Sequence, residues 1–222
     1  MIDDPDADAS RLAAEALAHN DPTGWFERLY AEAAAGQAIV PWDHSEPNPV
    51  LSQWTAQREL DGTGRTALVV GAGLGRDAEH IASLGFRTTA FDISPTAIRG
   101  ARERHPASTV DYVVADLLAP PEAWTGAFDL VVESITVQSM PLSVRPEAIA
   151  HVARMVAPGG QLVVISGIRE EGEDVDGPPW PLTRAELGAF ATGGLHAMHV
   201  EQVPGPAQPG SLRWRAEFLR KS

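Results

Sequence analysis

The sequence predicts an α/β fold with a mostly parallel sheet and helices on both of its faces. Between residues 66 and 166, short apolar runs typical of strands alternate with segments of helical periodicity. This alternation indicates parallel strands joined by right-handed helical crossovers. A glycine-rich turn follows the first strand, and two strand-like runs separated by PGPAQPG end the chain. The tail therefore predicts an antiparallel pair at the sheet edge.

Composition limits the class of protein. The chain has 222 residues, 44% of them hydrophobic, which is enough for one substantial core, whereas two separate cores would be small. A formal net charge of −13 argues against nucleic acid or an anionic membrane as a partner, because such ligands need clustered Lys and Arg. The absence of cysteine excludes disulfides and cysteine nucleophiles and fits a reducing compartment. With the acidic start MIDDPDADAS, these features predict a soluble, cytoplasmic protein.

Residues 1–62 are expected to form an N-terminal helical extension and lid, part of the same domain as the core at 63–222. Residues up to about Ala9 are acidic and polar and are predicted to be disordered. The Ala-rich stretch Ser10–His19 predicts a short helix.

A second helix and a proline-rich segment complete the extension. Asp21 and Thr23 are candidate N-caps for a helix with apolar residues at helical spacing that ends near Gly36. Residues 40–51, VPWDHSEPNPVL, contain three prolines, so they predict an ordered loop or lid. A helix through Trp54 and Leu60 is expected to follow.

The core elements follow in order from Thr66. The predicted strands are 66–71, 87–91, 110–114, 128–133 and 161–166. The predicted helices are 76–84, 95–104, 144–156 and the short 184–191. Ser94 is the expected N-cap of the second of these helices, with Pro95 at its first position, and Pro158-Gly159-Gly160 is expected to end the third. LHAMHVEQV and SLRWRAEFLRK supply the antiparallel pair.

The glycine turn raises the question of its ligand. A dinucleotide-binding turn reads G-x-G-x-x-G, whereas this chain reads G-A-G-L-G-R from Gly71, with the last glycine one position early. Asp92 ends the second strand about 20 residues after the first glycine, where a carboxylate can accept both hydroxyls of a ribose. Because Ser94 already provides a helix cap, we favour ribose binding for Asp92.

Two further acids follow later strands at the same sheet edge. Asp116 in VVADLL either accepts from an adenine amino group or is a solvated turn residue, and Glu133 in FDLVVES ends the fourth strand. Backbone amides can bind phosphate unaided. The three acids, including Asp92, nevertheless suit a ligand with a positive centre better than a pyrophosphate.

The motifs ALVVGAGLGRDAEHIA, TTAFDISPTAI, VVADLL, FDLVVES and APGGQLVVI, taken together, resemble those of class I S-adenosylmethionine-dependent methyltransferases over residues 66–166. The resemblance implies a Rossmann-like, seven-stranded sheet with a reversed final hairpin. It also implies S-adenosylmethionine as the cofactor, S-adenosylhomocysteine as the product, and a small-molecule methyl acceptor. The cofactor-binding residues that it implies are Gly71, Ala72, Gly73, Gly75, Asp92, Ile93, Asp116, Leu117 and Glu133.

A narrower resemblance covers nearly the whole chain. GWFERLYAEA, VPWDHSEPNPVL, GLGRDAEHIASLGF and GPPWPLT are similar to the thiopurine methyltransferase family and its halide and thiol methyltransferase relatives. It implies a monomer with Trp42 over the cofactor sulfonium, Asp43 close by and Arg145 near the acceptor. A cation over an indole is worth about 0.5–2 kcal/mol. Alternatively, Trp42 plugs the lid into the core, and Arg145 pairs with Glu147 or solvent.

The chain also departs from this family. Ala72 stands where the family often has cysteine, and SITVQSMPLS after the fourth strand is less aromatic than usual. These departures leave the identity of the acceptor open.

The expected chemistry is an in-line methyl transfer that depends on proximity and orientation. A thiol with a pKa near ~8.5 is partly thiolate at neutral pH, whereas an alcohol needs a positioned base. His44 is the best candidate base, although a loop histidine is more often solvated. His196 and His199 are expected on opposite faces of a strand, so no metal site is predicted. A soft acceptor of the thiol, thiopurine or halide type is favoured, with an oxygen or nitrogen acceptor kept open.

Two functions outside this class could use the same glycine turn. An NAD-dependent oxidoreductase predicts the pyrophosphate spacing that the turn lacks, and the single lysine, Lys221, leaves no residue for a catalytic Tyr-Lys pair. A non-catalytic cofactor-binding protein would keep the same glycines and Asp92. The sequence favours a methyltransferase over both.

Overall fold

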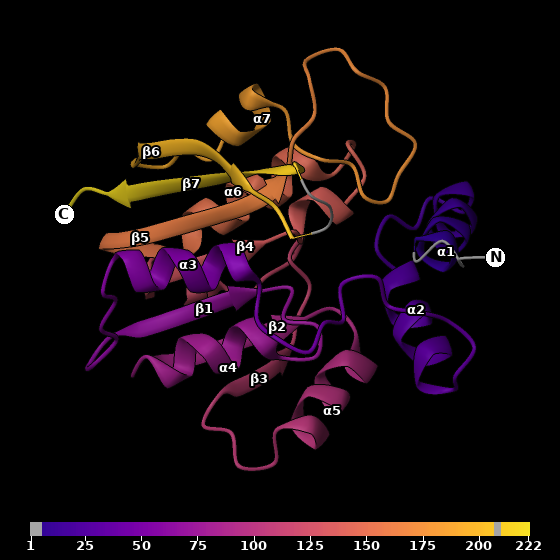
Figure 1. Cartoon of the computed structure of the whole chain (residues 1–222), viewed down its shortest axis with the longest axis horizontal. Helices are drawn as coiled ribbons and strands as arrows, with labels where there is room; N and C mark the ends of the chain where they lie inside the picture. The colour runs from indigo at the N-terminus through magenta and orange to yellow at the C-terminus, as the bar shows by residue number, and fades with distance from the viewer. Residues whose placement is uncertain (1–5, 207–209) are drawn as a thin grey trace.

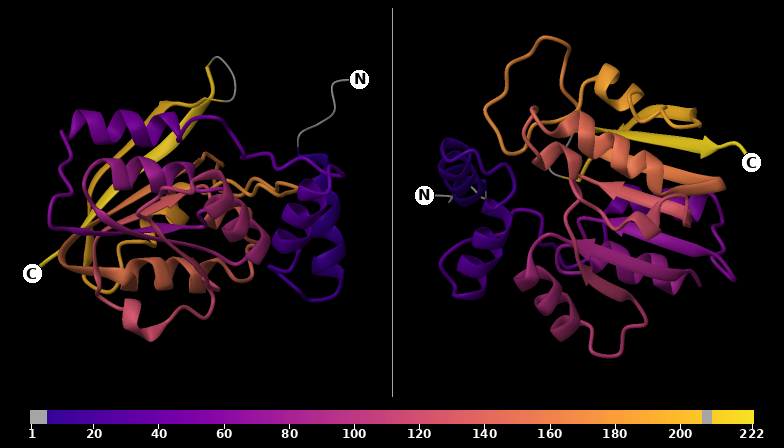
Figure 2. Two further views of the ribbon diagram at one scale, coloured as in Figure 1. Left: turned by 90° about the horizontal axis from the view of Figure 1, so that it is seen from below. Right: turned by 180° about the vertical axis from the view of Figure 1, so that it is seen from behind.

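In the computed structural model, which describes residues 6–206 and 210–222, the chain forms a seven-stranded sheet with helices on both faces (Figures 1 and 2). The strand order is β3-β2-β1-β4-β5-β7-β6. Strands β1 to β5 pair in parallel, and β7 runs antiparallel to both β5 and β6. The predicted α/β fold with its antiparallel C-terminal hairpin is confirmed.

The elements have the following bounds. The strands are β1 (Thr66–Val70), β2 (Arg87–Asp92), β3 (Asp111–Val114), β4 (Phe128–Ser134), β5 (Val156–Gly167), β6 (Leu195–Pro204) and β7 (Leu212–Arg220). The helices are α1 (Ala7–Ala18), α2 (Trp25–Ala34), α3 (Pro49–Gln57), α4 (Arg76–Ser83), α5 (Pro95–Arg104), α6 (Arg145–Met155) and α7 (Arg184–Gly188), with single 3₁₀ turns at η1 (Glu122–Trp124) and η2 (Val137–Ser139). Among the described residues, no helix is both long enough and apolar enough to cross a bilayer.

The sheet separates two apolar layers because neighbouring residues of a strand point to opposite faces. On β1, Leu68 and Val70 join the layer that α6 covers, whereas Ala67 and Val69 join the layer beneath α3 and α4. A third apolar cluster joins α1 and α2 and reaches Ala97 on α5. The N-terminal helices therefore pack beside the carboxyl ends of the central strands, as Figure 2 shows.

Several predicted boundaries were wrong. Helix α1 begins at Ala7, so the last residues of the predicted disordered start are helical, while residues 1–5 lie outside the described ranges. Helix α3 ends at Gln57, before Leu60, and α7 ends at Gly188 instead of residue 191. Asp21 accepts from the backbone N–H of Gly24, the residue at the N-cap of α2, so it supports this helix start from outside.

The largest boundary error concerns β5. Pro158-Gly159-Gly160 was expected to end a helix, but α6 already ends at Met155 and the three residues lie within β5. The ladder with β4 shifts register here, between Phe128 and Leu130. Proline and glycine are tolerated in strands at such irregular positions, because a regular ladder hydrogen bond is not required of each residue.

Ser94 links the core to the N-terminal helices. Its hydroxyl oxygen accepts from the backbone N–H of Ala97, which confirms Ser94 as the N-cap of α5, and its O–H donates to Glu27 on α2. Glu27 also accepts from the backbone and hydroxyl of Thr96. One carboxylate on α2 is thereby held by the first turn of α5.

We expect Ser94→Ala to lower the free energy of unfolding by about 1–2 kcal/mol, since it removes the helix cap and a partner of Glu27. Urea denaturation followed by circular dichroism measures this change. Ser45→Ala, at an exposed loop position, serves as the control and should be neutral. A Ser94 variant as stable as the control would contradict the linking role.

Candidate functional site

The glycine turn between β1 and α4 forms the floor of the site. Gly71 and Gly73 have φ angles of +62° and +52°, in the left-handed region that favours glycine. A Cβ on Gly71 would lie 2.2 Å from Oγ1 of Thr136, and a Cβ on Gly73 would lie 2.8 Å from Oη of Tyr30. Backbone conformation and close approach therefore both require glycine at these two positions.

Asp92, at the end of β2, fixes this turn. Its Oδ2 accepts from the backbone N–H of Gly73 (2.9 Å), and its Oδ1 accepts from that of Ser94 (2.9 Å). The residue is only 7% exposed, and burial raises the pKa of its carboxyl to about 6. A carboxylate in this position can still accept from a ligand, because each oxygen has more than one lone pair.

Two adjoining cavities open over the turn at the carboxyl ends of the parallel strands. The smaller, of about 60 Å³, is lined by Asp92, Ile93, Asp116 and Leu117, and the larger, of about 410 Å³, reaches Ala72, Gly73, Asp43 and His44. The residues that line both are Tyr30, Trp42, Gly71, Ser134, Ile135 and Ser139. Most of the predicted site residues are thus brought together.

Trp42 stands where the two cavities meet. Its indole Nε1–H donates to Oη of Tyr30 (2.7 Å), and its ring meets that of Trp25 edge-on, with centroids 6.1 Å apart. Burial raises the pKa of Tyr30 well above its ordinary value. The hydroxyl of Tyr30 therefore stays protonated and fixes the orientation of the indole.

The rest of the proline-rich loop is tied down at both ends. Asp43 forms a two-pronged ion pair with Arg104 on α5, at 2.6 and 3.0 Å. The backbone N–H of Asn48 donates to Asp77 (2.7 Å), and the Asn48 side-chain amide donates to Oγ of Ser134 (3.0 Å). The loop is ordered over the glycine turn, as the prolines predicted.

Glu133 does not line either cavity. It is fully buried, its Oε1 accepts from the backbone N–H of Val137 (2.8 Å), and its Oε2 has no hydrogen-bond partner among the described residues. Burial raises the pKa of its carboxyl to about 7. Within the turn that Glu133 caps, Ile135 has a φ of +59°, which is a strained conformation for a β-branched residue.

Arg145 also lies away from both cavities. It lies in the first turn of α6, but it is 1% exposed and pairs with Glu186 instead of Glu147 or solvent. His196 and His199 are both exposed on β6, and the described residues contain no group of three or more His, Asp or Glu placed to hold a metal ion.

Three site residues were missed in the sequence. Tyr30 was predicted only as part of an apolar helix face, and Asp77 was assigned no role. Asn48 caps α3 by accepting from the backbone N–H of Val50, a role that its position before Pro49 signals. The first two gave no comparable signal, because their partners lie far away in the sequence.

Comparison with known proteins decides the class. Residues 67–160 match a family described as "Methyltransferase domain". A 2-heptyl-1-hydroxyquinolin-4(1H)-one methyltransferase of Mycobacteroides abscessus is 28% identical over 73% of this chain and 72% of its own length. A ubiquinone biosynthesis O-methyltransferase of Xanthomonas oryzae is 34% identical over 63% of this chain, which spans about three fifths (61%) of that enzyme.

A thiol methyltransferase and a solved structure extend the comparison. Probable thiol methyltransferase 2 of Arabidopsis thaliana is 27% identical over 72% of this chain and 74% of its own length. The N-methyltransferase NodS of Bradyrhizobium japonicum, in complex with S-adenosylhomocysteine, has the same fold, with a TM-score of 0.66 and 21% identity over 88% of this chain and 100% of NodS.

The chain is an S-adenosylmethionine-dependent methyltransferase, and residues 67–160 are the part that matches the methyltransferase domain. Its own residues are suited to that cofactor. The glycine cradle at Gly71 and Gly73 leaves room that a Cβ would fill, and the buried carboxylate of Asp92 lies beside it. The cofactor supplies the activated methyl group, and the methyltransferase supplies the cavity that orients it.

If Asp92 binds the ribose as the sequence predicts, we expect Asp92→Asn to weaken S-adenosylhomocysteine binding by about 10- to 100-fold, because the variant lacks the charge-assisted hydrogen bond. Isothermal titration measures the affinity, and Asp111→Asn, at an exposed position on β3, is the control. Wild-type affinity should also fall below about pH 6, where Asp92 gains a proton. Equal affinities of wild type and Asp92→Asn, or a pH dependence that persists in the variant, would show that Asp92 does not contact the ligand.

Glu133 makes the stability of this methyltransferase depend on pH. Its pKa is raised from 4.5 to about 7 in the folded state, so between these values the folded chain holds more protons than the unfolded chain. Stability contributed at this position is therefore present at low pH and is lost as pH rises through about 7.

We expect Glu133→Gln to keep the hydrogen bond from Val137 and to gain stability relative to wild type as pH rises from 5 to 8, by about 2 kcal/mol. Urea denaturation at both pH values measures the difference, with Glu122→Gln, an exposed position, as the control. A difference that is constant with pH would show that Glu133 does not titrate in this window.

Proposed function

We propose that this methyltransferase transfers its methyl group to a soft nucleophile of the thiol, thiopurine or halide type, with a small thiol as the preferred acceptor. The observation that carries the proposal is the position of Trp42, which borders both cavities beside the glycine turn. An indole face there stabilises a sulfonium by cation–π attraction without any charged partner.

The proposed cofactor pose follows from the smaller cavity. Asp92 accepts from the ribose hydroxyls and Asp116 from the adenine amino group. Ile93 and Leu117, which line the same cavity, pack against the purine. Gly71, Ala72 and Gly73 allow close approach of the methionine end, and Gly75, with a φ of +93°, sets the start of α4.

The acceptor is proposed to enter the larger cavity. Apolar groups form part of its wall, among them Val40, Pro41, Pro178 and Pro179. Such a wall suits an apolar molecule that carries a polarisable sulfur. The similarity to a thiol methyltransferase over 174 residues supports the same acceptor class.

The proposed reaction depends mainly on alignment, which can lower a barrier by roughly 7–11 kcal/mol in favourable cases. His44 lines the larger cavity at an exposed position, where its ring can take a thiol proton and pass it to water. Asp43 stabilises the loop through Arg104 and is proposed to act on Trp42 indirectly.

Methyl transfer to oxygen is the second candidate. It is favoured by the 34% identity to ubiquinone biosynthesis O-methyltransferases. The lid-and-core division at residue 62, a monomeric state and a cytoplasmic location remain predictions.

We expect thiophenol to be methylated, iodide to react more slowly and phenol to react least, with release of S-adenosylhomocysteine as the readout. His44→Ala should change the thiophenol rate by less than about tenfold, because a thiolate needs little base assistance, whereas general-base catalysis contributes roughly 10²–10⁴-fold. His19→Ala, on an exposed face at the end of α1, is the control. A clear preference for phenol, with a large loss in His44→Ala, would favour the oxygen acceptor.

A further inference from the structure

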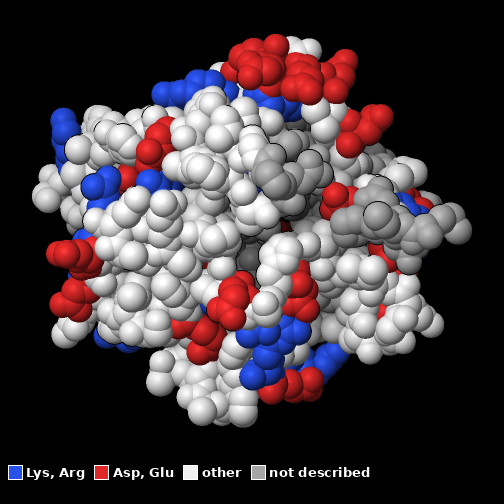
Figure 3. Space-filling model, viewed as in Figure 1, with Lys and Arg blue, Asp and Glu red and all other residues white. Residues whose placement is uncertain are grey.

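A strap closes one side of the larger cavity. We use this name for residues 169–182, the loop between β5 and α7 that arches over the top of the molecule in Figure 1. Its two ends are paired, since the backbone N–H of Arg169 donates to the carbonyl of Leu182, and that of Leu182 donates to Gly167. Near its second end, Pro178 and Pro179 line the cavity. Acidic side chains gather over the strap in Figure 3.

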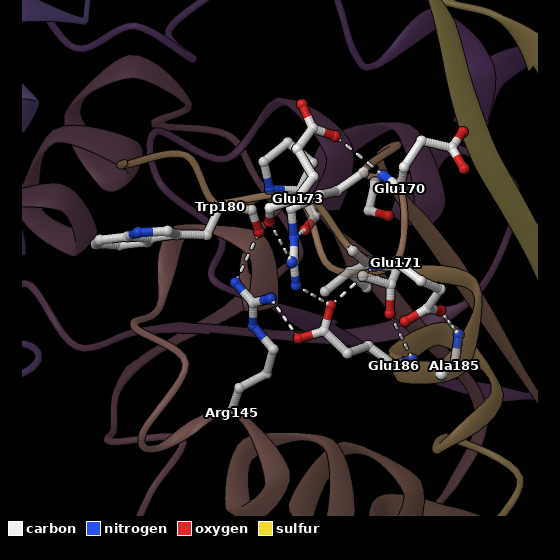
Figure 4. Close-up of polar contacts among 12 residues, drawn as sticks. Arg145, Glu170, Glu171, Glu173, Trp180, Ala185 and Glu186 are labelled. Carbon is white, nitrogen blue, oxygen red and sulfur yellow. Dashed lines mark hydrogen bonds and ion pairs between the residues drawn. The ribbon is translucent and has the colours of Figure 1, made fainter. Parts of the chain in front are cut away.

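Glu186 on α7 holds both ends of the strap (Figure 4). Its Oε1 accepts from Nη1 of Arg145 (2.7 Å), and its Oε2 accepts from Nη2 of Arg169 (2.8 Å). Oε2 also accepts from the backbone N–H of Thr183, which completes a capping box at the start of α7. Burial disfavours the charged carboxylate, but the hydrogen bond from the Thr183 backbone and the ion pairs with Arg145 and Arg169 together lower the pKa of Glu186.

Arg145 connects the strap to the turn that follows β4. Its Nη2 donates to the carbonyl oxygens of Trp180 (2.7 Å) and Met140 (3.1 Å). Met140 lines the smaller cavity at the end of the turn that begins after β4. A second bond runs parallel to this one, from the backbone N–H of Trp180 to the carbonyl of Gln138 (2.7 Å).

This geometry differs from that of a residue that contacts a substrate. The guanidinium of Arg145 is enclosed, and its described partners are two backbone carbonyls and one carboxylate. The planar guanidinium can donate to both carbonyls and the carboxylate at once, whereas the ammonium group of a lysine cannot. Burying such a charge is costly unless its partners are in place, so the clamp favours one position of the strap.

We propose that the strap is the wall that selects the methyl acceptor, and that Arg145 and Glu186 are positioning residues that hold Pro178 and Pro179 against the cavity. The chain of contacts runs from Glu186 through Arg145 to Trp180, directly beside these prolines. The inference depends on the proposed acceptor chemistry in one respect, the choice of thiophenol and thioanisole as probes.

Arg145→Lys and Glu186→Gln test the clamp, with Arg154→Lys and Glu147→Gln, at exposed positions on the same helix α6, as matched controls. Amide hydrogen exchange in residues 169–182 reports the position of the strap. The affinity for thioanisole, the methylated product of thiophenol, is measured by titration in the presence of S-adenosylhomocysteine and requires no turnover. The Michaelis constant for thiophenol is measured alongside.

Both clamp variants should exchange the strap amides faster and bind thioanisole about tenfold more weakly, as expected for the loss of a charge-assisted hydrogen bond. Their affinity for S-adenosylhomocysteine should not change, and the controls should match wild type. A merely structural role would weaken both ligands together. If Arg145→Lys does not fold, Glu186→Gln decides alone, since its side chain is partly exposed.

Unchanged strap exchange in the clamp variants would overturn the proposal, and so would thioanisole affinity equal to that of wild type. Failure of the wild-type protein to bind thioanisole would also overturn it. Binding without turnover of thiophenol would count against the proposed reaction alone, because the strap would still select a ligand.

Discussion

The carboxylate of Asp92 is the group on which the site depends. It accepts from the backbone of Gly73 on one side and of Ser94 on the other, so the glycine turn and the start of α5 are fixed relative to each other. Ser94 passes this constraint to the N-terminal helices through Glu27. A short series of hydrogen bonds thus joins the glycine turn, the β2–α5 unit and the N-terminal helices. Burial raises the pKa of this carboxyl to about 6, although the two backbone amides stabilise its charged form and act in the opposite direction.

Two of the buried charges near the cavities, those of Glu133 and Arg145, support the walls and do not line the cavities. Glu133 caps the turn in which Ile135 is strained, and Arg145 joins that turn to the strap. Strain at a pocket-lining residue persists only where its surroundings fix it, and a buried carboxylate and a buried guanidinium supply that constraint. These two charges therefore hold in place the turn after β4, which borders both cavities, and the strap, which borders the larger one.

Local sequence patterns predicted the sheet and its hairpin, because strand and helix periodicities, glycine turns and caps such as Ser94 act over a few residues. The same patterns placed Asp92 and Asp116 near one another, since parallel strands end at one edge, whereas the family resemblance placed Trp42 beside them. The patterns missed Tyr30 and Asp77, and the resemblance put Arg145 near the acceptor, because the partners of these side chains lie on distant elements. Glu186, which pairs with Arg145, is 41 residues away in the chain. The predicted starts of α1 and β5 were also wrong. Tertiary packing overrides local preference at α1, and an irregular ladder does so at β5.

The loop that carries Trp42 affects the order in which the products leave. Trp42 borders both cavities, and it is attached to α2 through Tyr30, while its neighbour Asp43 is attached to α5. In the proposed pose the nucleoside lies in the smaller cavity, which Trp42 borders, whereas Pro178 and Pro179 of the strap line the larger cavity. A methylated molecule in the larger cavity need not displace the indole to leave, but the spent nucleoside has to wait until the loop detaches from two helices. We therefore expect ordered turnover, with the spent cofactor as the last species to leave.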